Sequence, residues 1–246
     1  MNRAFGLDIG GTGIKGAVVD LDTGELLSER IRIPTPQPST VEAVLDTVER
    51  IVHQAGWEGP IGCTFPGIVK QGVIGSAANV DTSWIGVHLA ERLTDRLDRP
   101  ATVLNDADAA GLAEMRLGAG RGEPGVVLLL TLGTGIGSAL FVDGRLVPNT
   151  ELGHLELDGF RAERRAATSA RERDELSFRV WAEERLQPYF SHVETLFSPD
   201  LFIVGGGVSR KAEKFLPLLS LRTRIIPAQL RSNSGIVGAA LQSARA

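Results

Sequence analysis

The chain has 246 residues, of which 43% are hydrophobic and 5% aromatic, and its formal net charge is −4. This length can bury one large core or two smaller ones, and the charge balance argues against a dedicated nucleic-acid-binding protein. The single cysteine, Cys63, excludes a disulfide framework and a cysteine-rich zinc site. The first residues lack the apolar core of a signal peptide and no apolar stretch could cross a membrane, so we expect a cytoplasmic protein.

The first half of the chain alternates short apolar runs with turn residues. A helix is predicted between Ser39, which has capping-box spacing to Glu42, and Gly56. A second helix, rich in small residues, is predicted over 106–117. The apolar runs predict strands over residues 4–9, 16–21, 26–33, 61–65 and 102–104.

The second half begins with the same kind of pattern. Asp143-Gly144 predicts a hairpin turn. The charged stretch 160–196 is predicted to be mostly helical, and a small-residue helix is expected over 235–244. Strands are predicted over residues 126–131, 138–142 and 201–204.

A strand, a glycine-rich turn and a second strand occur near residue 10 and again near residue 135. This repeat predicts an α/β protein of two similar lobes that face one another, with both turns at the cleft between them. We expect residues 1–104 and the C-terminal helix 232–246 to form the smaller lobe, and residues 105–231 the larger one.

The two glycine-rich turns are candidate phosphate-binding loops. Glycines let backbone N–H groups converge on a phosphate. Asp8 could hold Mg²⁺ through its water shell. One such turn fits an ordinary hairpin equally well, but two matched turns favour a phosphate-rich ligand. The turn at 205–207 fits a tight connection nearly as well as a ligand contact. The residues expected at the phosphate donor are Gly10, Gly11, Thr12, Gly13, Lys15, Thr131, Gly133, Thr134, Gly135, Gly206, Gly207 and Lys211.

Two polar motifs could serve a polyol substrate. Asn105-Asp106 stands where a predicted strand meets a helix, a position that suits either a general base or a helix N-cap. The segment 151–156 places His154 between two acids, which fits a sugar site, a metal site or a solvated loop.

In their order along the chain, these motifs resemble the ROK sugar kinases of the actin/hexokinase/Hsp70 superfamily. The shared motifs are the first glycine loop, the Leu-Asn-Asp-Ala-Asp-Ala-Ala-Gly-Leu-Ala-Glu segment at 104–114, the second glycine loop and Glu151-Leu152-Gly153-His154. Within that family the chain looks most like the polyphosphate glucokinase branch. Further similar segments lie at 64–67, 78–86, 148–151, 199–203, 209–212 and 235–240.

The resemblance implies a two-lobed actin-like ATPase (ribonuclease H-like) fold with a central cleft. It implies Mg²⁺-dependent phosphoryl transfer from polyphosphate, and from ATP, to the 6-hydroxyl of glucose, with Asp106 as the catalytic base. We also expect a homodimer without nucleic-acid or membrane partners. The residues implied at glucose are Asn105, Asp106, Glu151, His154, Gly67, Asn79 and a downstream acid, either Glu163, which we prefer, or Glu156.

One departure from the family concerns metal. Many ROK proteins have a zinc-binding cysteine cluster after the Gly-His pair, and no cysteine follows His154 here, so we expect no zinc. The polyphosphate branch shares this loss.

The donor is less well defined than the acceptor. A polyphosphate chain needs a cationic track, although the arginine-rich 161–173 run fits a solvated helix face as well or better. The rivals are an ATP-only ROK hexokinase or glucomannokinase, and a sugar-sensing ROK regulator. Regulators carry a helix-turn-helix before the first loop, and only seven residues precede Asp8, so we expect a kinase. The candidate track residues are Lys15, Arg121, Arg164, Arg165, Arg171, Arg173, Arg210, Lys211 and Lys214.

Overall fold

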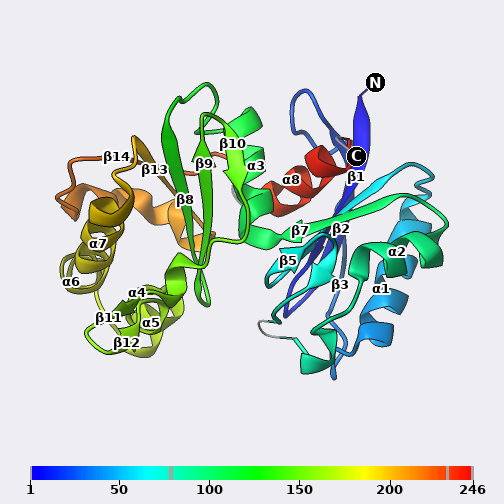
Figure 1. Ribbon diagram of the computed structural model, residues 1–246, viewed down its shortest axis with the longest axis horizontal. Helices are drawn as coiled ribbons and strands as arrows, with labels where there is room; N and C mark the ends of the chain where they lie inside the picture. The colour runs from blue at the N-terminus through cyan, green and yellow to red at the C-terminus, as the bar shows by residue number, and fades with distance from the viewer. Residues whose placement is uncertain (1, 78–79, 231–232, 245–246) are drawn as a thin grey trace. The chain divides into compact units, whose positions relative to one another are not determined.

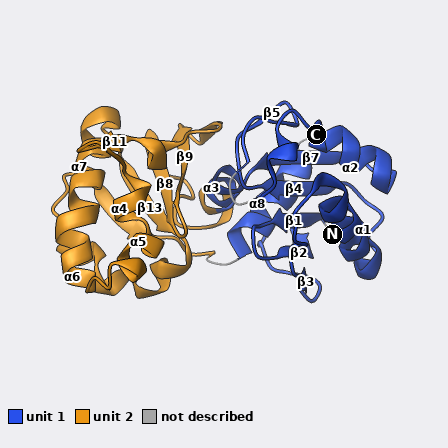
Figure 2. Ribbon diagram, turned by 90° about the horizontal axis from the view of Figure 1, so that it is seen from below, with its two compact units in different colours: residues 1–113, 233–246 blue, residues 114–232 orange. Residues whose placement is uncertain are grey.

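The computed structural model describes residues 2–77, 80–230 and 233–244; the predicted sugar-side residue Asn79 lies outside this range. The chain forms two compact units, residues 1–113 with 233–246, and residues 114–232 (Figure 2). The division falls within helix α3 (Asp106–Leu117) rather than at the predicted 104/105 boundary. The reason is packing: a Cβ on Gly238 would lie 1.8 Å from the Ala109 carbonyl oxygen, so the start of α3 is built into the first unit.

The first unit contains a five-stranded sheet in the order β3-β2-β1-β4-β7 (Figure 1). The antiparallel pairs are β1–β2 and β2–β3, and β1, β4 and β7 run parallel. The predicted third strand is shorter than 26–33, because Ser28 Oγ accepts the Val18 N–H that would otherwise continue the ladder. The strands are β1 (Arg3–Ile9), β2 (Ile14–Asp20), β3 (Ile31–Ile33), β4 (Ile61–Phe65) and β7 (Ala101–Asn105).

The two faces of this sheet are packed differently. Alternate residues such as Leu7 and Cys63 join a core with α1 (Val41–Ala55) and α2 (Leu89–Leu97). The intervening residues face α8 (Ser234–Ser243), whose backbone approaches so closely that a Cβ on Gly62 would lie 1.7 Å from a carbonyl oxygen. The small residues of α8 therefore serve close helix-to-sheet packing.

The predicted capping box at α1 is wrong. The helix begins after Thr40, which makes no side-chain capping hydrogen bond. Ser39 Oγ instead accepts the backbone N–H of Asp81, and its carbonyl accepts the indole N–H of Trp84. The Ser39 hydroxyl therefore makes a tertiary hydrogen bond instead of capping α1.

The second unit repeats the strand arrangement of the first. Its sheet has the order β10-β9-β8-β13-β14, again with three antiparallel strands followed by two parallel ones. Asp143 and Gly144 form the predicted hairpin turn, both with positive φ. The strands are β8 (Val126–Leu132), β9 (Ile136–Val142), β10 (Arg145–Val147), β13 (Leu201–Gly205) and β14 (Arg224–Pro227).

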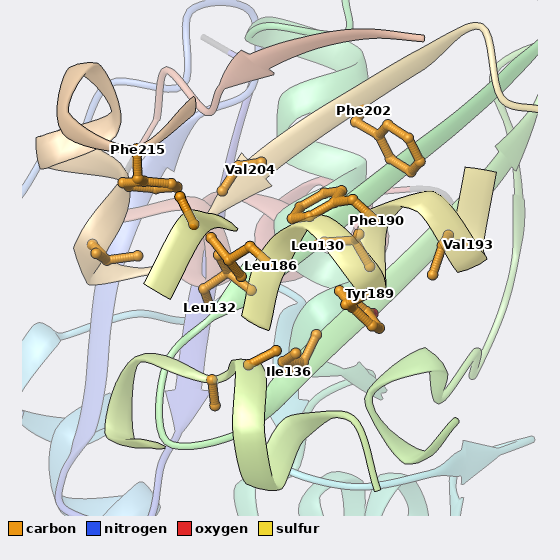
Figure 3. Packing of buried hydrophobic residues seen from close by; sticks show 14 of the residues in the cluster. Leu130, Leu132, Ile136, Leu186, Tyr189, Phe190, Val193, Phe202, Val204 and Phe215 are labelled. Carbon is orange, nitrogen blue, oxygen red and sulfur yellow. The ribbon is translucent and has the colours of Figure 1, made fainter. Parts of the chain in front are cut away.

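The helical segment that follows β10 covers this second sheet. In the core of the unit, the Phe190 ring meets Phe202 of β13 edge-on, with centroids 5.3 Å apart (Figure 3). Pro188 lacks an N–H, and a π turn precedes it in which the Gln187 N–H bonds the Ala182 carbonyl. The helical pieces are α4 (Glu163–Ala166), α5 (Thr168–Arg173), α6 (Phe178–Trp181), the π turn (Ala182–Leu186) and α7 (Gln187–Phe197).

Short elements complete both units. No helix among the residues described is long and apolar enough to cross a membrane. The short strands are β5 (Val69–Lys70), β6 (Val73–Ile74), β11 (Glu156–Leu157) and β12 (Phe160–Arg161). The 3₁₀ helices are η1 (Thr82–Trp84), η2 (Leu152–His154), η4 (Gly207–Lys214) and η5 (Leu216–Leu218).

Candidate active site

The first glycine turn joins β1 to β2 and stands beside a fixed carboxylate. The Gly10 N–H donates to the Gly13 carbonyl at 3.2 Å. Asp8 lies opposite Lys15 in the strand register, with Oδ2 and Nζ 3.2 Å apart. On its other side, the fully buried Thr64 donates its hydroxyl to Asp8 Oδ1 at 2.9 Å. Both carboxylate oxygens are therefore oriented from neighbouring strands.

Thr64 is a site residue that the sequence reasoning did not single out. It belongs to a segment shared with the family, but its contact with Asp8 depends on the pairing of β1 with β4. Residues 56 positions apart carry no local signal of such a contact.

The surroundings of Asp8 suit a hydrated Mg²⁺ ion brought with a phosphate. A carboxylate has about four acceptor sites, and two of these are used by Lys15 and Thr64. Mg²⁺ commonly takes one or two carboxylates and keeps its remaining waters. Within residues 2–77, 80–230 and 233–244, no three His, Cys, Asp or Glu side chains gather as a protein-only metal site would need.

Asn105 and Asp106 lie where β7 meets α3. Asn105 Oδ1 accepts the backbone N–H groups of Ala107 at 2.8 Å and Asp108 at 3.1 Å, so Asn105 caps the helix. Its amide nitrogen donates to the Gly67 carbonyl at 3.0 Å. The cap fixes the exposed Asp106 at the first helical position, where the helix dipole favours a carboxylate.

The second glycine turn, between β8 and β9, is tied down through its carbonyl groups. The Gly133 N–H donates to the Gly135 carbonyl at 3.0 Å. Ser169 donates its N–H to the Gly133 carbonyl at 3.1 Å and its hydroxyl to the Thr134 carbonyl at 2.6 Å. Thr168 Oγ1 bonds the Leu132 carbonyl. The first turn of α5 thus fixes this loop, a contact that no local sequence pattern indicated.

Two of the predicted sugar residues, His154 and Glu163, lie together beside this loop within the second unit. His154 Nε2 lies 3.5 Å from Glu163 Oε1, and Glu163 Oε2 accepts the Ile136 N–H at 3.4 Å. Gly153 permits the approach, because a Cβ there would lie 2.2 Å from the Ile136 carbonyl oxygen. Glu163 therefore connects His154 of the predicted sugar-binding segment 151–156, called the sugar motif below, to the start of β9 next to the glycine loop.

The alternative acid, Glu156, has a different setting. It is exposed and pairs with Arg161 in the β11–β12 hairpin. Glu151 lies closer to the cluster: burial raises the pKa of its carboxyl group, His154 lowers that pKa and Glu163 raises it. Glu151, His154 and Glu163 are thus electrostatically coupled.

The third glycine turn opens η4, a 3₁₀ helix with a kink at Lys211. Gly206 has φ +85°, and a Cβ there would lie 2.3 Å from the Leu132 carbonyl oxygen at the end of β8. Close backbone packing therefore accounts for this glycine. The exposed Lys211 lies within η4.

Several arginines of the predicted track have protein partners. Arg171 donates to the Leu176 carbonyl at 3.0 Å, and its guanidinium lies 4.5 Å from the Phe178 ring centroid. Arg173 pairs with Asp174 at 2.7 Å. Part of the 161–173 run thus stabilises the second unit.

Comparison with known proteins gives consistent relatives. A polyphosphate glucokinase of Mycobacterium tuberculosis is 52% identical over 242 residues, with 98% of this chain and 91% of that protein covered. An inorganic polyphosphate/ATP-glucomannokinase from Arthrobacter sp. strain KM superimposes with a TM-score of 0.94 at 57% identity, covering 100% of this chain and 99% of that one. A ROK family glucokinase from Streptomyces griseus, in complex with glucose and AMPPNP, superimposes with a TM-score of 0.83 at 26% identity. The match covers 99% of this chain and 100% of that one.

These likenesses confirm the predicted α/β, actin-like ATPase fold class. The ROK family model matches residues 4–169, more than half of the chain. The chain belongs to the ROK family.

Proposed function

We propose that this ROK protein is a glucokinase that transfers a phosphoryl group from inorganic polyphosphate, and also from ATP, to the 6-hydroxyl of glucose. The observation that carries the proposal is near full-length similarity, at 52% and 57% identity, to two proteins named for polyphosphate-dependent sugar phosphorylation. The product is glucose 6-phosphate.

Asp106 is the proposed catalytic base. Its carboxylate accepts the proton of the sugar hydroxyl as the oxygen attacks the terminal phosphorus. The bond from that phosphorus to the bridging oxygen breaks, and the shortened polyphosphate, or ADP, leaves. The cap by Asn105 supports this role, because it fixes the backbone that carries Asp106. Asn105 also retains a second amide hydrogen that can bond a sugar oxygen, since Gly67 takes only one.

Glu151, His154 and Glu163 are proposed to bind the vicinal hydroxyl groups of glucose. Carboxylates accept hydroxyl protons, and an imidazole can donate or accept. The 3.5 Å contact of Glu163 with His154, which Glu156 does not share, supports Glu163 as the downstream acid.

The two glycine loops are proposed to hold the phosphate donor, with Lys15 and Lys211 as cations. Mg²⁺ held near Asp8 would neutralise charge on the transferring phosphoryl group. Lys211, which is exposed on η4, is proposed to contact a polyphosphate chain longer than ATP. Charge contacts along polyphosphate should make its affinity fall with ionic strength, by analogy with nucleic acids, and more steeply for long chains than for short ones.

The test is a parallel donor assay on enzyme freed of nucleotide. Glucose 6-phosphate formation is measured with Mg²⁺ and either long-chain polyphosphate or ATP, and mannose replaces glucose in a second series. Turnover when polyphosphate is the sole donor present supports the proposal. Turnover with ATP only would make the protein an ATP-dependent ROK hexokinase, the second candidate. Sedimentation of the same sample tests the proposed homodimer.

A further inference from the structure

A row of polar side chains crosses the first sheet next to the first glycine turn. Strand register places Arg32 of β3 opposite Lys15 of β2, Lys15 opposite Asp8 of β1, and Asp8 opposite Thr64 of β4. Directly opposed residues point to the same side of a sheet. These four side chains therefore share one face, the face on which Gly235 of α8 approaches Asp8.

The charges in this row do not balance. Lys15 and Arg32 are cations on adjacent strands, and like charges in directly opposed positions destabilise a sheet. Asp8 compensates Lys15 through the 3.2 Å ion pair. Arg32 takes part in none of the ion pairs found among the described residues. Arg32 thus adds a positive charge beside the glycine turn that no ion pair among the described residues offsets.

Arg32 also lies directly against the glycine turn. A Cβ on Gly13 would be 2.9 Å from Arg32 Nε, and Arg32 Nη2 lies 3.5 Å from the Thr12 carbonyl oxygen. The absence of a side chain at Gly13 therefore makes room for the guanidinium. Arg32 is exposed, so its other N–H donors can reach a ligand in the turn.

We propose that Arg32 is a phosphate-binding residue of the donor site, which grips the anionic donor together with Lys15 at the first glycine turn. A guanidinium presents a planar fork of N–H donors that matches two phosphate oxygens, which an ammonium group cannot do. The inference rests on the proposed function, since it assigns Arg32 to the donor of that reaction.

The experiment measures binding of inorganic tripolyphosphate to the whole protein by calorimetry, without glucose. The variants are Arg32→Gln, Arg32→Lys and a matched control, Arg50→Gln, which removes an exposed arginine from α1 on the other face of the sheet. We expect Arg32→Gln to weaken binding by roughly 10-fold, the loss of one charged hydrogen bond. The affinity of Arg32→Lys for tripolyphosphate should lie between those of Arg32→Gln and wild type, and the affinity of Arg50→Gln should match that of wild type.

Thermal melting of the ligand-free variants separates ligand binding from a structural role. Removing one of two opposed cations should leave the melting temperature of Arg32→Gln unchanged or raise it. A clear fall in melting temperature, or tripolyphosphate affinity equal to wild type, would overturn the proposal.

Kinetics keep this inference separate from the function. If wild type phosphorylates glucose and Arg32→Gln shows an unchanged KM for the donor, the inference fails while the function stands. If wild type binds tripolyphosphate through Arg32 but phosphorylates no glucose, the inference about binding stands and the function fails.

Discussion

The two glycine turns sit on sheets of the same strand order but differ in chemistry. Strand register makes Asp8, Lys15 and Thr64 of the first unit equivalent to Thr131, Gly137 and Gly205 of the second. A charged row in one unit thus corresponds to a neutral row in the other.

This difference shows how a repeated fold can divide one reaction. The charged turn offers cations and a carboxylate, the groups that phosphate and Mg²⁺ require. The neutral turn is fixed by the first turn of α5 and carries the acids and imidazole of the sugar motif beside it. In our account, the charged groups beside the first turn serve the donor and Mg²⁺, whereas the acids and imidazole beside the second turn serve the sugar.

The largest effect is expected at the base. Asp106→Asn keeps the size of the side chain but cannot accept the proton, so kcat should fall by roughly 10²–10⁴. Glucose affinity, measured by calorimetry, should stay near the wild-type value because the amide keeps the shape of the carboxylate and part of its hydrogen bonding. A variant with near-wild-type kcat would remove Asp106 from the mechanism.

Close packing in the two units can be compared by adding a methyl group. Gly62→Ala places a Cβ 1.7 Å from the Ala239 carbonyl oxygen, and we expect a loss of roughly 3 kcal/mol in the free energy of unfolding. Gly153→Ala, with 2.2 Å to the Ile136 carbonyl oxygen, should in addition raise the KM for glucose because it displaces the sugar motif. Gly207→Ala meets no atom within 4 Å and is the control. Denaturant unfolding that ranks Gly207→Ala with the other two would contradict the packing described.

Thr64 from the charged row of the first unit and Thr131 from the neutral row of the second should respond unequally to loss of the hydroxyl group. Thr64→Val removes the hydrogen bond to Asp8, so the Mg²⁺ concentration for half-maximal rate should rise by roughly 10-fold, and Thr64→Ser should restore it. The Thr131 methyl group faces Gly205, and Thr131→Val should shift the same value by roughly 3-fold or less. Equal shifts would mean that Asp8 is not the carboxylate that matters for Mg²⁺.

The smallest effect concerns pH and Glu151. Its raised pKa means that the folded protein holds this proton to a higher pH than the unfolded chain does. The contribution of Glu151 to stability is therefore fully present below the ordinary pKa of 4.5 and is lost as pH rises through the folded pKa. Glu151→Gln should remove this fall. Melting temperatures of wild type and variant, plotted against pH, should diverge above pH 4.5, with the variant relatively more stable. Parallel plots would exclude this explanation.

The sequence predicted most strands and the repeat, because alternating apolar runs and glycine turns are local signals. It also predicted the short sequence motif that brings Glu151 near His154. It failed where distant segments compete for one group, as at Ser39, whose hydroxyl binds Asp81 rather than the start of α1. It did not indicate that Thr64 and Arg32 lie beside the first glycine turn, because only the pairing of distant strands brings them there.

The most direct test of this division of labour compares one variant from each unit in the same assay. Lys15→Gln alters the charged turn, and His154→Asn alters the sugar motif. The account predicts that Lys15→Gln raises the KM for polyphosphate and leaves the KM for glucose near wild type, whereas His154→Asn does the reverse. If each variant raised both constants to a similar extent, the assignment of Lys15 to the donor and of His154 to the sugar would be contradicted.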